Sequence, residues 1–460
     1  MNHSIYEKGA VVLVVIIPFL LRIPLLFMGF GVEEDAWGHV LNAIEMKIDG
    51  HYIISRLPGH PAMELLSCLL LKSFGTKALL WNLPFALAGS WASLEFYRIA
   101  RLHKMEAALW LTLCFNAVPS VLFAGATTMD YIFQLALILW AYRSMLKGKW
   151  WWVGIALGLA MSFRLTSALF ALAIALQWTL RREWRFSNFS AIALPMALIT
   201  VLAFWPAYQQ LGSSFFSTYA LPYPPLAKVF FKGSIGLLGP VGFVTVSVLL
   251  LRTFRKIPKE PMLPFWLGVI LLHLLVFIRL PEKSAFLLPA IPFLFLMIGL
   301  NHEKSFLRNL SFLLLIGLFV GGINLNHPER GSSRSMVSVT KAISGQDISF
   351  DLLLGPYGGE WTKRQNKAAY VASVQKCRRQ RQDSDEVLIA GWWYAMMQID
   401  FWQEKGKLDE SLVYYADEEK LEIALERGGE LFALPEQEEV NHRKHGTDYL
   451  ANRIRSYPCP

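Results

Sequence analysis

The stretch AVVLVVIIPFLLRIPLLFMGF, residues Ala10–Phe30, decides what kind of protein this sequence encodes. A second apolar run of similar length covers Phe306–Leu325, and further runs lie between the two. Each is about 20 residues long, enough for a helix that rises about 1.5 Å per residue to cross a hydrocarbon core of about 30 Å. Of the 460 residues, 54% are hydrophobic and 17% are charged. The sequence therefore predicts a multi-spanning membrane protein.

The first apolar run is predicted to be an uncleaved transmembrane helix. It is too long for the apolar core of a signal peptide, lacks a small-residue cleavage site and is followed by more spans. Read in order, the apolar runs predict about eleven spans. They lie near residues 10–30, 77–97, 106–124, 129–145, 149–163, 166–180, 189–208, 233–251, 262–279, 284–300 and 306–325.

The net charge of +9 reflects membrane orientation rather than nucleic-acid binding, because the positive residues cluster in alternate connections between spans. These connections contain Lys8; Arg98, Arg101 and Lys104; Arg143, Lys147 and Lys149; Arg181, Arg182 and Arg185; Arg252, Arg255, Lys256 and Lys259; Lys304 and Arg308. The positive-inside rule places this set, and the N-terminus with it, in the cytoplasm. An odd number of spans then puts the C-terminal tail outside.

Two segments of the first outer loop are predicted to be interfacial helices. Ala62–Leu71 is apolar but too short to span. Ala36–Ile48 precedes it and carries Val40, Ile44 and Ile48 at helical spacing.

The chain is predicted to divide into a transmembrane domain, residues 1–325, and a small outer α/β domain, residues 326–460. After Asn326 the sequence becomes charged and alternates strand-like and helix-like segments. The expected strands are Glu386–Ala390, Leu412–Tyr415 and Glu430–Leu434, and the expected helices are Trp392–Glu404 and Asp417–Arg427. This βαβ order predicts a partly parallel sheet. Cys377 and Cys459 of this domain can pair if it faces an oxidising compartment.

The first outer loop gathers the residues best suited to chemistry. It contains Glu33-Glu34-Asp35-Ala36-Trp37-Gly38-His39, then His51-Tyr52, then Ser55-Arg56-Leu57-Pro58-Gly59-His60-Pro61. Capping the following helix needs one acidic residue rather than three, although capping remains the alternative interpretation. The acids Glu34 and Asp35 favour acid–base chemistry. Arg56, His39 and His60 lie nearby, and His60 alone is more often a structural hydrogen-bond donor. The acids and histidines are compatible with a divalent metal but do not require one.

Ionisable residues at the ends of other spans are also candidates, because such groups are costly at a membrane boundary. Asp130 begins a span, and an ordinary helix-capping role explains it equally well. Arg164 lies at an outward turn, where it can snorkel or hold an anionic headgroup. Arg279 and Lys283 flank Glu282 before a late span. The three cations break the positive-inside bias on the outer face, which indicates one anionic substrate, with a phosphate headgroup as the natural candidate.

The order of these motifs resembles the GT-C superfamily of membrane glycosyltransferases. The resemblance is to the bacterial branch that contains protein O-mannosyltransferase-like enzymes and aminoarabinose transferases acting on lipid A. When Met46 and Gly50 are aligned with the family's loop, Asp35 takes the position of its catalytic aspartate. Further motifs of the family fall on Gly38-His39, His60-Pro61, Gly158 with Arg164, and Leu280–Phe286. Glu34-Asp35-Ala36 replaces the family's Asp-Glu, so the choice of base between the two acids stays open, and His60 replaces the usual lysine.

The resemblance implies an all-α GT-C-like membrane domain that transfers a hexosyl or pentosyl group, with inversion, from a polyprenyl-phosphate donor. The acceptor would be a hydroxyl of a glycan, lipid or protein at the outer face of a bacterial plasma (inner) membrane. Asp35 would take the acceptor's proton. Arg164, Lys283 and His60 would stabilise the leaving phosphate, and Arg56 and Arg279 are the further candidates for binding it. No cofactor is required by this chemistry, and no nucleotide-sugar motif stands in a cytoplasmic domain.

Two other classes of function fit parts of the pattern. A transporter or flippase of a lipid-linked or anionic substrate would use the same intramembrane cations. The sequence shows neither an inverted repeat nor paired broken helices, and transport does not need an acidic outer loop. A non-catalytic scaffold would use the outer domain to bind a partner, but would not need ionisable residues clustered on one side.

Overall fold

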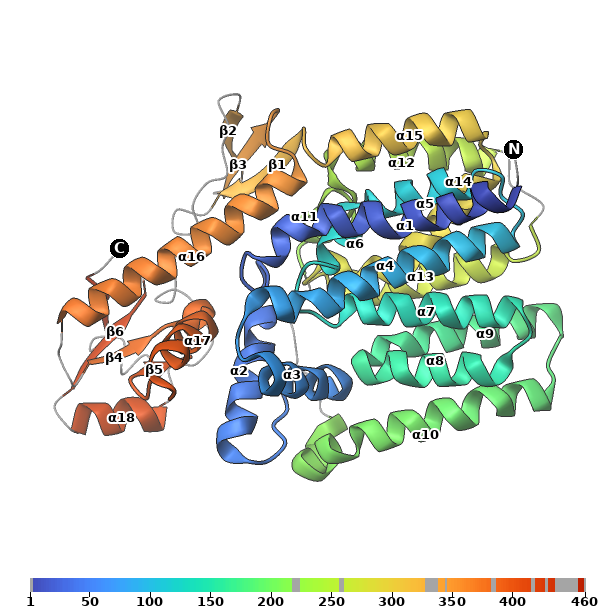
Figure 1. The fold of residues 1–460 in the computed structure, drawn as a ribbon. Helices are drawn as coiled ribbons and strands as arrows, with labels where there is room; N and C mark the ends of the chain where they lie inside the picture. The colour runs from blue at the N-terminus through green and yellow to red at the C-terminus, as the bar shows by residue number, and fades with distance from the viewer. Residues whose placement is uncertain are drawn as a thin grey trace.

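The computed structural model describes residues 3–216, 224–255, 260–326, 338–343, 346–381, 386–414, 418–426, 429–434 and 454–458. In this part of the chain every regular element up to Gly317 is a helix, and the strands begin at Gly322. Long helices lie side by side in one part of the molecule, and the strands gather with three further helices beyond one end of them (Figure 1).

The predicted span at 106–124 is divided into two short helices. The helices of this part otherwise lie close to the predicted apolar runs. They are α1 (His3–Leu26), α4 (Ala78–Leu102), α5 (Ala108–Asn116), α6 (Pro119–Ala124), α7 (Tyr131–Leu146), α8 (Trp150–Phe163), α9 (Ala168–Arg181), α10 (Phe186–Leu211), α12 (Ile235–Arg255), α13 (Leu263–Arg279), α14 (Ile291–Leu300) and α15 (Lys304–Gly317). Short 3-10 turns accompany them at η1 (Leu165–Ser167), η2 (Gly212–Phe216) and η3 (Ser284–Ala290). Glu7–Leu26, Phe186–Phe215 and Ile235–Thr253 are each long and apolar enough to cross a membrane, and shorter apolar helices pack with them. The expected multi-spanning membrane protein is confirmed.

The membrane helices pack in a series, α1 on α4, α4 on α7, α7 on α8 and α8 on α10. The last pair approaches closely because α8 offers glycine at the contact. A Cβ added to Gly154 would lie 2.4 Å from the carbonyl oxygen of Ile192 in α10. Small residues of this kind let helix backbones meet in membranes, where lipid tails provide no hydrophobic drive for association.

The last predicted span is shorter than its apolar run. The helix α15 ends at Gly317, and β1 (Gly322–Asn326) takes up the end of the run. The turn between them passes through Gly321, whose φ is 71° and whose N–H donates to the carbonyl of Leu352. The prediction of a helix to Leu325 is therefore wrong at its end, because pairing with a distant strand outweighs local apolar character.

The two predicted helices of the first outer loop are confirmed as α2 (Glu34–Asp49) and α3 (Pro61–Phe74). The apolar stripe of α2 buries Val40 and Ile44, while Ile48 stays exposed. In Figure 1, α2 crosses the ends of the long helices. A further short helix, α11 (Leu226–Gly233), precedes α12.

The C-terminal part contains two small sheets. The strands β1, β2 (Ser338–Ile343) and β3 (Gln346–Asp351) form an antiparallel sheet in the order β1-β3-β2. The strands β4 (Glu386–Ile389), β5 (Leu412–Val413), β6 (Glu430–Ala433) and β7 (Ile454–Ser456) form a parallel sheet in the order β5-β4-β6-β7. The helices α16 (Pro356–Arg381), α17 (Tyr394–Lys405) and α18 (Glu418–Glu426), with the turn η4 (Gly391–Trp393), complete this α/β unit. The expected βαβ rhythm is confirmed, while the first sheet and the long α16 were not predicted.

The parallel sheet is held over the first outer loop. The helix α17 packs on α2, and Nζ of Lys47 lies 5.6 Å from the ring centre of Trp402. Trp37 of α2 packs against the apolar cores of both the membrane part and the α/β unit. Cys377 of α16 is disulfide-bonded, and Cys459, the partner that the sequence suggested, lies outside the described residues.

Candidate active site

Three acidic residues begin α2, and helix capping does not account for them. Glu33 is the N-cap residue, yet its side chain makes no capping hydrogen bond. Glu34 and Asp35 lie in the first turn, where the helix dipole favours negative charge. The contacts of Asp35 are instead with cations from distant parts of the chain.

Asp35 binds two of these cations. Its Oδ2 lies 2.5 Å from Nη1 of Arg56 and also accepts a hydrogen bond from Nζ of Lys283, which lies 2.7 Å from Oε2 of Glu33. Burial opposes ionisation of Asp35, but the charges of Arg56 and Lys283 outweigh it and hold the pKa of this carboxyl below its usual value. Burial likewise disfavours the charged form of Lys283, and Glu33 and Asp35 raise the pKa of its ammonium group. Both groups are therefore charged at neutral pH.

A second ion pair joins Arg164 to Asp130. Nη1 of Arg164 lies 3.0 and 2.9 Å from the two carboxylate oxygens, and both side chains are buried. The guanidinium carbon lies 4.4 Å from the ring centre of Tyr131 and 4.8 Å from that of Phe286, a cation–π arrangement. Asp130 is the N-cap residue of α7 but makes no side-chain capping bond. Arg164 is thus fixed inside the protein rather than extended to the surface.

Two histidines connect these ion pairs. Nδ1 of His60 lies 2.9 Å from Oδ2 of Asp130 and 2.8 Å from the carbonyl oxygen of Phe163. Nε2 of His39 lies 3.3 Å from Nη2 of Arg56, and the two histidine rings are 6.3 Å apart. Burial, helped by the charge of Arg56, lowers the pKa of His39 well below its usual value, so its ring is neutral. We call the connected group the charge cluster: Glu33, Asp35, His39, Arg56, His60, Asp130, Arg164 and Lys283.

The loop that carries Arg56 and His60 is held by a carboxylate that sequence reasoning missed. Oε1 of Glu64 accepts hydrogen bonds from the N–H and hydroxyl of Ser55, at 2.8 and 2.7 Å, and from the N–H of His60 at 3.1 Å. Its other oxygen accepts a hydrogen bond from the hydroxyl of Tyr52. Glu64 is fully buried in α3. The sequence feature that could have identified Glu64 is an acidic residue inside a short apolar helix. Tyr52, a predicted site residue, therefore supports the loop instead of joining the charge cluster.

Three other predicted residues lie outside the charge cluster. Glu34 hydrogen-bonds the side chain of Tyr414 in the α/β unit, and burial raises the pKa of its carboxyl to about 7. Arg279 is exposed at the end of α13. Glu282 is exposed, and both of its oxygens lie 2.8 Å from Nζ of Lys228.

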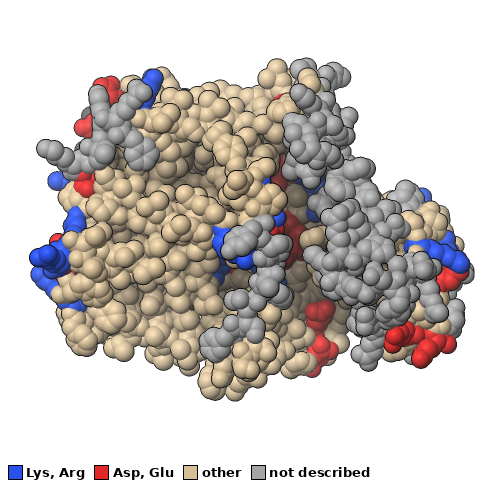
Figure 2. All heavy atoms as spheres, turned by 180° about the vertical axis from the view of Figure 1, so that it is seen from behind, with Lys and Arg blue, Asp and Glu red and all other residues tan. Residues whose placement is uncertain are grey.

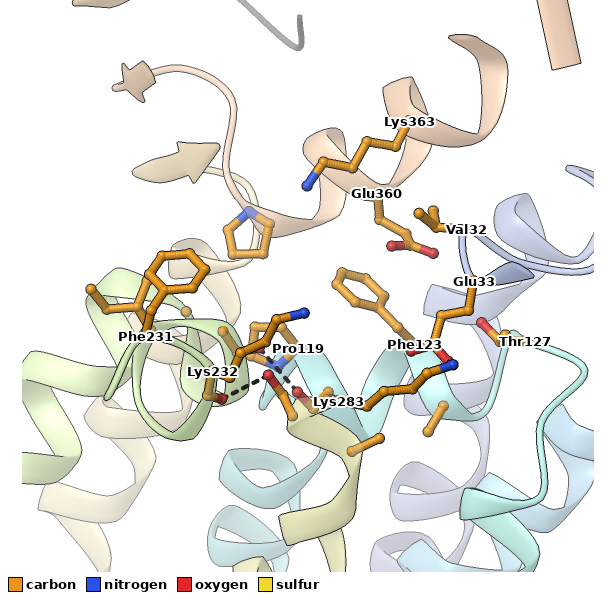
Figure 3. A pocket seen from close by; sticks show the side chains of 18 of the residues that line it. Val32, Glu33, Pro119, Phe123, Thr127, Phe231, Lys232, Lys283, Glu360 and Lys363 are labelled. Carbon is orange, nitrogen blue, oxygen red and sulfur yellow. Dashed lines mark hydrogen bonds and ion pairs between the residues drawn. The ribbon is translucent and has the colours of Figure 1, made fainter. Parts of the chain in front are cut away.

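Two cavities adjoin the charge cluster. The first, which we call the Arg164 cavity, has a volume of about 260 Å³ and is lined by Arg164 and His60 together with apolar side chains such as Leu169 and Val276. The second, which we call the Lys283 cavity, has a volume of about 340 Å³ and is lined by Lys283 and Glu33 (Figure 3). Tyr131, which stacks on Arg164, also lines the second cavity. Phe286 ends the segment Leu280–Phe286 that the sequence matched to a motif of the family. Tyr131 was not singled out from the sequence, because an aromatic residue in an apolar run is common.

Glu33, Asp35 and His39 of the first outer loop face protein cations. Nδ1 of His60 lies between Asp130 and the carbonyl oxygen of Phe163. Among the described residues, no three His, Cys, Asp or Glu side chains form a group suited to a metal ion. The oxygens of Asp35 face Arg56 and Lys283, and His39 faces Arg56.

Comparison with known proteins identifies the class of fold. No known protein family matches the sequence, and no curated protein matches it. Two solved structures of ArnT from Cupriavidus metallidurans do match. The form bound to undecaprenyl phosphate has a TM-score of 0.51 at 19% identity, over 64% of this chain and 60% of that chain. The apo form has a TM-score of 0.52 at 18% identity, over 68% of this chain and 63% of that chain.

The chain therefore shares the fold of ArnT, a polytopic helical domain with a small C-terminal α/β part. It spans 60% and 63% of the length of the two ArnT chains. The structural resemblance expected from the order of the motifs is confirmed at the level of the fold.

Proposed function

We propose that this protein is an inverting glycosyltransferase that moves a sugar from a polyprenyl-phosphate donor to an acceptor hydroxyl. The observation that carries the proposal is the ionised carboxylate of Asp35, held by Arg56 and Lys283 in the same charge cluster as Arg164. The apolar lining of the Arg164 cavity suits a polyprenyl chain. ArnT, whose fold is shared, was solved with undecaprenyl phosphate bound, which supports a donor of this kind.

The donor phosphate would bind by exchanging partners. Each of Arg56, Lys283 and Arg164 is paired with a carboxylate in the resting protein. A donor phosphate competes for these cations because charge-assisted hydrogen bonds to phosphate are strong. When Lys283 turns from Asp35 to the phosphate, an oxygen of Asp35 becomes free to accept a proton.

The transfer then proceeds in one displacement. The acceptor hydroxyl gives its proton to Asp35, and its oxygen forms a bond to the anomeric carbon on the face opposite the phosphate. The bond from that carbon to the phosphate oxygen breaks, and the phosphate leaves with the electron pair. Its growing negative charge is stabilised by Lys283 and Arg164. A phosphate leaves without help from a general acid, so one carboxylate base is sufficient.

We place the reaction on the outer face of a bacterial plasma membrane. The positive connections between spans orient the N-terminus to the cytoplasm. The disulfide at Cys377 supports an oxidising environment for the α/β unit, because cytosolic thiols are kept reduced. A labelling reagent that cannot cross the membrane tests this orientation: a single cysteine introduced by Lys405→Cys should react in intact cells, and one introduced by Lys147→Cys should not. Both tests use a background in which the free cysteines Cys68 and Cys114 are replaced by serine.

The enzyme is tested with purified protein in nanodiscs and a panel of radiolabelled polyprenyl-phosphate pentoses and hexoses. Wild type is compared with Asp35→Asn and with its neighbour Glu34→Gln. Loss of a general base typically costs about a hundredfold or more in rate, so Asp35→Asn should lose sugar release while still binding donor. Glu34→Gln should keep most of its activity, because that carboxyl faces Tyr414.

Equal loss in both variants, or none in Asp35→Asn, would contradict Asp35 as the base. If no donor is turned over but a lipid-linked sugar crosses the bilayer of proteoliposomes, the protein is a transporter instead. The donor that is turned over identifies the sugar class.

A further inference from the structure

The Lys283 cavity lies across Lys283 from the Arg164 cavity. Lys283, Ser284 and Ala285 line the Lys283 cavity, and Phe286, next in the chain, lines the Arg164 cavity. The remaining walls of the Lys283 cavity come from α6, from the start of α12 and from α16 of the α/β unit (Figure 3). The two spaces therefore reach the charge cluster from different sides.

Two lysines reach into the Lys283 cavity from opposite walls. Lys232 lies at the end of α11 and Lys363 on α16, and Figure 3 shows both ammonium groups directed into the space. Within the described part of the chain, neither ammonium group has a hydrogen bond or an ion pair. Burial lowers the pKa of Lys232 and of Lys363. The charge of Glu33 partly opposes this at Lys232, and that of Glu360 partly opposes it at Lys363.

Other charged side chains near this cavity are paired with side chains of opposite charge. Nζ of Lys228, one turn before Lys232, is held by Glu282, and Oε1 of Glu360 lies 2.9 Å from Nη2 of Arg364. Lys232 and Lys363 are half-buried. Holding a charged ammonium group in such a place without a hydrogen-bonded partner costs free energy, and an anion between the two lysines would offset that cost.

The helix α11, which borders the cavity, is amphipathic. On α11, Leu226 and Phe230 are 83% and 60% exposed, while its lysines lie on the other side towards the protein. A short helix with exposed apolar residues and basic residues on its other face suits the interface of a bilayer.

We propose that the Lys283 cavity binds an anionic group, a phosphate or a carboxylate, of the acceptor, and that Lys232 and Lys363 select acceptors carrying it. This inference rests on the glycosyltransferase proposed above. The donor occupies the Arg164 cavity, and the acceptor approaches Asp35 from the other side of Lys283. The two lysines act by holding the acceptor's charge, and the base remains Asp35.

The test measures thermal stabilisation of the purified full-length chain by matched probes. Glucose 6-phosphate is compared with glucose, and dihexanoyl phosphatidic acid with dihexanoyl glycerol. Each probe is applied to wild type, Lys232→Gln, Lys363→Gln and the control Lys228→Gln, whose ammonium group is already paired. We expect the charged probes to stabilise wild type and the control, and about tenfold more probe to be needed in the other two variants. Binding of undecaprenyl phosphate should be equal in all four proteins.

The outcomes distinguish the two possible sources of the anionic group that the cavity binds. Stabilisation by both charged probes supports a site for the anionic group itself, and stabilisation by the lipid probe alone supports a lipid headgroup. Equal binding of charged and neutral probes, or loss of undecaprenyl phosphate binding in Lys232→Gln, overturns the proposal.

Donor turnover is measured in parallel without acceptor. If turnover persists while the anion effect is missing, the enzyme stands and this inference fails; if turnover is missing while the anion effect persists, the proposed function fails instead.

Discussion

At the scale of single residues, the charge cluster is organised by shared partners. Oδ2 of Asp35 is approached by both Arg56 and Lys283, and one oxygen of Asp130 faces both Arg164 and His60. Each acid is thereby kept ionised, Asp130 in a buried position and Asp35 in a half-buried one. Each cation can exchange its carboxylate partner for a phosphate. Charges in such a network act together, so removing one leaves others unmatched.

Glu64 should be essential to the shape of the first outer loop. Glu64→Gln replaces an acceptor-only carboxylate with an amide that cannot accept all the bonds from Tyr52, Ser55 and His60. We expect a loss of about 1–3 kcal/mol in the free energy of unfolding. Thermal unfolding in nanodiscs measures it, and Glu282→Gln, at an exposed ion pair, should change the midpoint little. Equal effects of the two variants would contradict this role.

Glu34 should make stability depend on pH. Burial raises the pKa of this carboxyl from 4.5 to about 7 in the folded state, so the folded state binds the proton more tightly than the unfolded state does. The stability that Glu34 contributes is present at low pH and is lost as the pH rises through about 7. The wild-type midpoint should therefore fall between pH 5 and pH 8 relative to that of Glu34→Gln. Parallel midpoint curves for the two proteins would contradict the prediction.

At the scale of elements, a buried arginine closes the short helix α6. Nε of Arg22 lies 3.1 Å from the carbonyl oxygen of Leu122, and Nη2 lies 3.4 Å from that of Val121. The helix is only one to two turns long, so these carbonyls lack helical partners. Gly89 and Gly125 leave room for the guanidinium, since an added Cβ at either would meet it within 2.8 Å.

Arg22→Met should therefore destabilise the membrane domain. It leaves two buried carbonyls without donors, at a cost of about 1–3 kcal/mol each. Thermal unfolding in a neutral detergent measures the loss, with Arg101→Met on the exposed side of α4 as the control. If Arg22→Met unfolds at the same temperature as wild type, the carbonyls of Val121 and Leu122 accept hydrogen bonds from other donors in the variant.

At the scale of the whole molecule, the α/β unit is bound to the membrane part near the charge cluster. Arg364 of α16 donates hydrogen bonds from Nη1 to the carbonyls of Leu25 and Ala126, both at 3.0 Å. Nζ of Lys367 donates to the carbonyl of Val32 at 2.6 Å, next to the acids of α2. Figure 2, seen from behind, shows acidic and basic side chains gathered where the two parts meet, on a surface that is otherwise largely uncharged over the membrane helices.

Arg364→Met should loosen this attachment without unfolding either part. The hydrogen bonds of a buried guanidinium contribute about 1.5–3 kcal/mol each, and their loss frees α16 from the end of α1 and from the connection after α6. We expect amide hydrogen exchange at Ala126 and Thr128 to speed up about tenfold or more, while exchange in β4 is unchanged. Arg455→Met, at an exposed ion pair far along the chain, is the control. Unchanged exchange at Ala126 and Thr128 would show that other contacts hold the unit in place.

The sequence alone predicted a membrane protein of many helices and several residues of the charge cluster. The length of the apolar runs predicted the spans, the 3.6-residue spacing predicted α2, and the acids of the first outer loop drew attention to Asp35. These are local properties, read from neighbouring residues. Tertiary structure alone decided that Asp35 meets Lys283, 248 positions away, that Glu64 supports the loop, and that Lys232 and Lys363 face one cavity. Contacts of this kind depend on how the helices pack. The free energy of packing is a sum over the whole interior, so no short segment of sequence determines it.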